Sequence, residues 1–87
     1  MAFHNTAEER QVIKLLAKTS LPAEVTGAWV EQIQTVGLSE ELAEQIHNRL
    51  SHPVEGDAPL HNRAILILEF SQLVRKWRLV AGARKFH

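Results

Sequence analysis

Apolar residues recur every three or four positions along most of this chain, which is the spacing of amphipathic helices. Leu42, Ile46 and Leu50, for example, follow one another at steps of four, with charged and polar residues between them. No two segments show the β-branched alternation that a pair of half-buried strands requires. The pattern predicts helices over residues 7–18, 22–36, 40–51 and 59–80.

Residues that favour helix ends mark these boundaries. Thr6 and Glu9 have the spacing of a capping box, in which each side chain accepts a hydrogen bond from the other residue's backbone N–H. Pro22 suits a first helical turn, because its missing N–H would have no helical partner there. Gly37 is suited to a left-handed C-terminal cap, and Ser39 to an N-cap.

The last predicted helix contains Ile65, Leu66, Ile67 and Leu68 in a row, so it is apolar around its whole circumference. We expect it to be the central, most buried element, with Gly82 following its end. Dimerisation is a second way to bury so apolar a stretch in so small a domain. The predicted fold class is all-α, a compact bundle of four or five helices around a central apolar C-terminal helix.

The predicted core draws on the second, third and fourth helices. Gly27 weakens the middle of the second helix by roughly 1 kcal/mol relative to alanine, which we interpret as a mark of close helix packing. The expected core residues are Trp29, Val36, Leu42, Ile46, Ile65, Leu66, Leu68, Phe70, Leu73 and Trp77.

The chain is predicted to be a single helical domain over residues 1–87. Two prolines and a glycine predict a loop over residues 52–59. Neither side of this loop is long enough to fold alone, so it is not a domain linker. Residues 82–87 are predicted to form a basic C-terminal tail.

Charge is segregated along the sequence although the formal net charge is zero. Residues 19–57 contain seven acids and one base, whereas residues 58–87 contain six bases and one acid. The simpler interpretation is that the acidic helices pack against the basic helix within one molecule. The functional interpretation is that the two charges lie on different surfaces and meet a partner.

We expect a non-enzymatic protein-interaction module, either adaptor or regulatory, whose partner is another protein or a second copy of the chain. Self-association would join an acidic face of the second and third helices to the basic last helix, a head-to-tail contact that builds rings or filaments. In size, helix content and charge segregation the chain resembles small helical adaptor domains such as the death-fold group, which implies an architecture and no site residues. The candidate partner-binding residues are Arg75, Lys76, Arg78, Arg84, Lys85, Glu40, Glu41 and Glu44.

Nucleic-acid binding through the basic C-terminal segment is the alternative function. The segment 33–42 resembles the turn of a helix-turn-helix, but the helix after it would present Glu40, Glu41 and Glu44 to DNA phosphates and be repelled. The basic last helix also suits an anionic membrane surface, which we rank below nucleic acid.

Catalysis and metal binding find little support in the residue types present. The chain has no cysteine and no tyrosine, and it contains no glycine-rich phosphate loop. His47, His52 and His61 lack the four-residue spacing that places two imidazoles on one helical face. We therefore expect no catalytic residue, no metal and no cofactor.

The sequence also predicts a cytoplasmic location. Glu8 and Glu9 lie where a signal peptide would carry basic residues and then an apolar run. The longest apolar run covers residues 64–68, whereas a membrane-spanning helix needs roughly 18 to 20 apolar residues.

Overall fold

The computed structural model describes residues 4–54 and 62–85, with side chains as far as residue 81 in the last helix. This part of the chain is all-α and contains no strand, which confirms the predicted helical bundle. Its helices are α1 (Ala7–Ala17), α2 (Ala23–Val36), α3 (Glu40–Ser51) and α4 (Arg63–Lys85).

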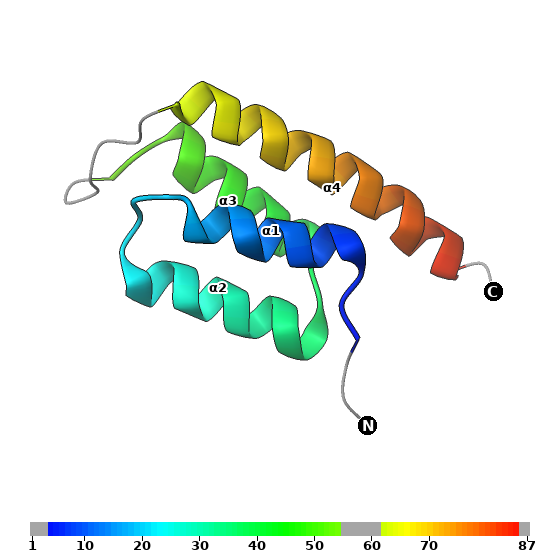
Figure 1. The fold of residues 1–87 in the computed structure, drawn as a ribbon. Helices are drawn as coiled ribbons and strands as arrows, with labels where there is room; N and C mark the ends of the chain where they lie inside the picture. The colour runs from blue at the N-terminus through cyan, green and yellow to red at the C-terminus, as the bar shows by residue number, and fades with distance from the viewer. Residues whose placement is uncertain (1–3, 55–61, 86–87) are drawn as a thin grey trace.

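Helix α1 packs against both α2 and α4, and α3 packs against α4. In Figure 1, α2 and α4 lie on opposite sides of the molecule, with α1 and α3 between them. Helix α2 contains two acids and no base, and α4 is the basic helix. These two helices are therefore kept apart.

The core forms where apolar faces of all four helices meet. Val12 and Leu16 of α1, Ile33 of α2, and Ile46 and Leu50 of α3 are each at most 1% exposed. From α4 the core takes the residues on one side of the helix, namely Leu66, Phe70, Val74 and Trp77. Among the described side chains of α4, those of residues 63–81, the buried ones all lie on that side.

The predicted core was wrong at three positions. Val36 is 68% exposed, Ile65 is 53% exposed and Leu68 is 58% exposed. The reason at α4 is geometric: α1 and α3 cover one side of the helix, so a run of four consecutive apolar residues places two of them on the uncovered side. Leu42, Ile46, Leu66, Phe70 and Trp77 are buried as expected, and Trp29 and Leu73 pack partly buried against the core.

The predicted capping box is present, and it extends into a tertiary contact. Glu9 Oε1 accepts a hydrogen bond from the Thr6 backbone N–H at 2.8 Å, and Thr6 Oγ1 accepts one from the Glu9 N–H at 3.0 Å. Glu9 Oε2 accepts a third from the Leu38 N–H at 2.7 Å, in the turn between α2 and α3. Asn5 Nδ2 donates to the Ile33 carbonyl oxygen, near the end of α2, at 2.7 Å. The start of α1 thus holds the α2–α3 corner.

The predicted helix ends were right at the α2–α3 corner and wrong at the end of α4. Gly37 ends α2 at a φ of 87° and a ψ of 173°, a positive-φ conformation open to glycine without steric strain, but an extended one and not the left-handed helical cap that the sequence predicts. Ser39 begins α3 by accepting a hydrogen bond from the Leu42 N–H at 3.1 Å. Gly82 does not end the last helix, because α4 continues to Lys85.

Part of the predicted loop and tail can be placed. His52 is the C-cap of α3, and Pro53 and Val54 are non-helical, whereas residues 55–61 lie outside the described part of the chain. Residues 82–85 are helical, and residues 86–87 lie outside the described part. Among the described residues, no helix is both long enough and apolar enough to cross a membrane.

Glu9 gives a direct test of the α1 contact. Glu9→Gln replaces one of the two accepting oxygens by an NH₂ donor, so one backbone N–H at this buried site loses its partner. We expect the free energy of unfolding in urea to fall by about 1–3 kcal/mol. The control Glu8→Gln removes the neighbouring carboxylate of the same first turn and should change stability by about 0.5 kcal/mol or less. Equal effects of the two substitutions would contradict this role for Glu9.

Gly27 gives a second test. A Cβ added at this position would meet nothing within 4 Å, so the predicted close helix packing is absent within the chain. Gly27→Ala should therefore raise the free energy of unfolding by roughly 1 kcal/mol, through helix propensity alone. The matched control Ala28→Gly, at the next exposed position of α2, should lower it by a similar amount. If Gly27→Ala lowered the free energy of unfolding instead, a neighbouring group would have to lie close to the added methyl group.

Candidate functional site

A groove of about 440 Å³ runs between α3 and α4, beside the charged residues that the sequence singles out. Ser39 positions its α3 wall by fixing where that helix begins. One wall is acidic and the other basic, and between them lie the side chains of core residues. The lining residues are Glu40, Ala43, Glu44 and His47 from α3, and Phe70, Ser71, Val74, Arg75 and Arg78 from α4.

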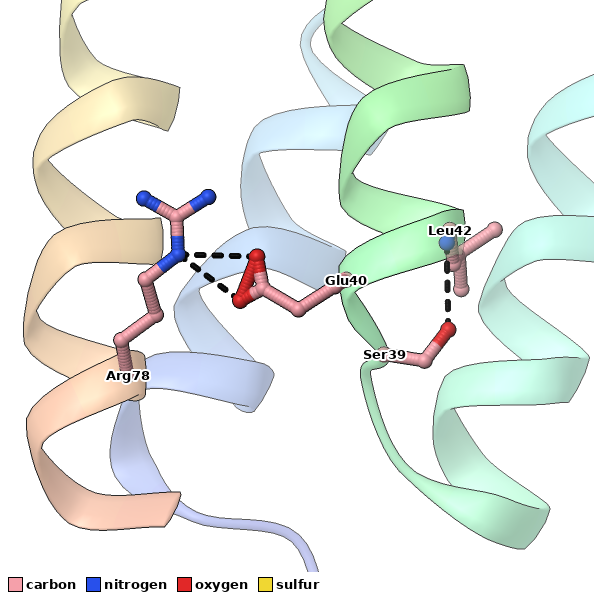
Figure 2. Close-up of polar contacts among 4 residues, drawn as sticks. All are labelled: Ser39, Glu40, Leu42 and Arg78. Atoms are coloured by element: carbon pink, nitrogen blue, oxygen red, sulfur yellow. Dashed lines mark hydrogen bonds and ion pairs between the residues drawn. The ribbon is translucent and has the colours of Figure 1, made fainter. Parts of the chain in front are cut away.

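An ion pair joins the two walls of this groove. Arg78 Nε donates to Glu40 Oε2 at 2.7 Å and to Glu40 Oε1 at 2.9 Å, as Figure 2 shows. The hydrogen bond to Glu40, together with the charge of that carboxylate, raises the pKa of Arg78 above its usual value. Both side chains are 58% exposed, so water and salt screen the attraction and the pair contributes little to stability.

Four of the predicted partner-binding residues are thus brought to one place. Glu40 and Arg78 pair within a single molecule, and Glu44 and Arg75 line the same groove. For Glu40 and Arg78 the simpler interpretation of the charge segregation therefore holds, because the acidic helix packs against the basic one.

The other four predicted residues lie elsewhere. Glu41 on α3 and Lys76 on α4 are exposed and do not line the groove. Arg84 and Lys85 belong to the last turns of α4, and their side chains lie outside the described residues.

The predicted partner-binding residues leave out an apolar surface on α4, which only the dimerisation alternative anticipates. Ile65 is 53% exposed, Leu68 is 58% exposed and Leu79 is 73% exposed. Gln72 and Arg75 lie between Leu68 and Leu79 and are exposed as well. Together the five positions follow one another at alternating steps of three and four residues. We call these five residues the outer face of α4. The spacing is visible in the sequence, but the neighbouring buried residues Leu66 and Phe70 make the segment resemble a helix buried on all sides.

Metal-ligating side chains do not cluster in the described part of the chain. Over residues 4–54 and 62–85, no group of three histidine, cysteine, aspartate or glutamate side chains is placed to hold a metal ion. His47 lines the α3–α4 groove, and His61 lies outside the described residues.

Comparisons of this chain with protein-family models, with curated proteins and with solved structures give no match. Its function is therefore inferred from the two surfaces of α4, the groove on one side and the outer face on the other.

The Glu40–Arg78 pair can be tested by a double-mutant cycle. We expect Glu40→Gln, Arg78→Gln and the double variant to unfold at nearly the same urea concentration as the wild type. Any coupling seen at low salt should disappear at high salt, because both side chains are exposed. A large coupling that persists at high salt would contradict this assignment.

Proposed function

We propose that this chain is a non-enzymatic, cytoplasmic protein-interaction module that binds its partner through the outer face of α4. The observation that carries the proposal is the exposure of Ile65, Leu68 and Leu79 on one side of one helix. Single exposed apolar residues are common on protein surfaces, whereas three large ones that share one side of a helix, here with Gln72 and Arg75 between Leu68 and Leu79, favour an interaction site.

The energetic argument rests on apolar area. Burial of apolar surface stabilises a contact by roughly 25 cal/mol per Å² removed from water. Leu68 and Leu79 each keep more than half of their surface exposed, so a partner that covers them gains from this effect. In such an assembly α4 would be covered on both sides, which would make it the central helix that the sequence predicts.

Charges beside the apolar row can select and orient the partner. Arg75, which belongs to the outer face, and Lys76 beside it are exposed and attract an acidic surface. On the far side of the molecule, α2 contributes Glu24 and Glu31 and no base. The head-to-tail association predicted from the sequence would join this acidic side of one copy to α4 of another and would compete for the same surface, although Arg78 is already paired with Glu40.

Nucleic-acid binding is the competing function, and it has a distinct signature. It requires retention on heparin or on a labelled oligonucleotide, with a steep loss of binding as salt rises. If a protein partner instead buries Ile65, Leu68 and Leu79, binding should persist as salt rises, because salt does not weaken apolar contacts.

Sedimentation equilibrium over a range of protein concentrations, at low and at high salt, tests the proposal. We expect the mass of the wild type to rise above 9.8 kDa with concentration, and Leu68→Ser with Leu79→Ser to return it to the monomer value. Val36→Ser is the matched control, since Val36 is 68% exposed on a different helix, and it should leave the mass unchanged.

Charge reversal separates the two driving forces. Arg75→Glu with Lys76→Glu should lower the mass at low salt only, to the extent that these bases contribute. Helix content by circular dichroism should stay the same in all variants. Serine variants that associate like the wild type, or a monomer that binds the oligonucleotide with steep salt dependence, would contradict the proposed function.

A further inference from the structure

We propose that the outer face of α4 pairs with the outer face of α4 in a second copy, antiparallel and around a two-fold axis. This inference rests on the proposed function, because it uses the same surface and names its occupant. It goes further by fixing the direction of the pairing and the residues that meet.

The outer face has the spacing of a coiled-coil seam. Its five residues fall at positions 65, 68, 72, 75 and 79, which are alternating steps of three and four and correspond to the a and d positions of a heptad. All five are exposed, so no other helix of the described chain packs over the seam, although Arg75 also borders the α3–α4 groove. The seam extends for about 21 Å at a rise of 1.5 Å per residue.

Charge decides the direction of the pairing. A parallel pair places like positions together, so Arg75 would face Arg75 of the other copy in the middle of the seam, and the bases that follow it would lie side by side. An antiparallel pair separates the basic halves of the two helices. It therefore avoids both repulsions.

The antiparallel register also matches side chains by kind. It places Leu68 against Leu79 of the other copy, and by symmetry Leu79 against Leu68. Between these two apolar layers it places Gln72 against Arg75, where the amide oxygen accepts a hydrogen bond from the guanidinium group. The seam is thus complementary to itself over residues 68–79, as a two-fold contact requires, and Ile65 lies beyond this overlap.

The flank of the seam adds a second match. Glu69 and Lys76 are exposed, lie seven residues apart and occupy the same side of the helix. In the antiparallel register Glu69 of one copy lies beside Lys76 of the other, and the two-fold axis repeats this pair. On the opposite flank Arg78 is already held by Glu40 of its own chain.

The limited length of the seam sets the expected affinity. A standard stable interface buries about 800 Å² on each partner, and one face of a single helix over this length offers less. We therefore expect a dimer that dissociates on dilution and does not grow into larger assemblies, because a two-fold contact is closed.

A charge swap tests the register. Glu69→Lys and Lys76→Glu each place like charges together at both symmetric positions, so each should raise the dimer dissociation constant by about tenfold in sedimentation equilibrium. The double variant restores opposite charges and should return the constant to within about threefold of the wild type. Glu41→Lys is the matched control, exposed on α3, and should have no effect.

Disulfide trapping tests the direction, since the chain contains no cysteine of its own. We expect Leu68→Cys mixed with Leu79→Cys to form a cross-linked dimer on oxidation, and Leu68→Cys alone to form none. Cross-linking of Leu68→Cys with itself would show a parallel pair and overturn the inference. A wild type that stays monomeric at every concentration, or grows beyond a dimer, would overturn it as well.

Failure of this inference can be told from failure of the proposed function. Suppose that Leu68→Ser with Leu79→Ser abolishes association, but that combining Glu69→Lys with Lys76→Glu does not return the dissociation constant to the wild-type value. The outer face of α4 is then the interaction surface, and the antiparallel register is wrong. If neither set of variants changes the mass of an associating wild type, both fall.

Discussion

The arrangement of the helices depends on one buried carboxylate. Glu9, only 2% exposed, accepts hydrogen bonds from its own helix cap and from the Leu38 N–H in the α2–α3 turn. A carboxylate is buried at an acceptable free energy only when its oxygens are hydrogen-bonded, and here each oxygen receives a backbone donor. A capping motif that is normally local therefore also holds the turn that leads into α3. The placement of α3 in turn determines where the groove against α4 runs.

Much of the fold could be predicted because helix ends and apolar spacing are local properties. Thr6, Gly37 and Ser39 act at the positions their chemistry suggests, since each one's effect depends on residues within a few positions of it. The tertiary role of Glu9 could not be predicted, because nothing in the sequence relates it to Leu38, 29 positions away. Gly82 failed as a helix end because a glycine within a helix lowers stability without obliging the helix to stop.

The candidate site was predicted in part. The rest could not be predicted, because it depends on contacts between residues that are far apart in the sequence. Charge segregation drew attention to Glu40 and Arg78, but a sequence does not say whether opposite charges 38 positions apart meet within one molecule or between two. In the structure this pair meets within the molecule. The apolar outer face of α4 was missed because a run of apolar residues does not reveal how many of its sides the fold will cover. Two helices pack against α4, and no other described helix covers its remaining side.

The position of α1 between α2 and α4 has a consequence for how the chain reaches its native state. The core residues of α1 gain their partners from α2 early in synthesis, but those that face α4 must wait until that later segment has left the ribosome. A nascent chain that ends before α4 exposes Leu15, which lies beside Leu73 of α4 and is buried once α4 is in place. Such a fragment is open to proteases and chaperones, so we expect this domain to fold after translation of α4 in one cooperative step.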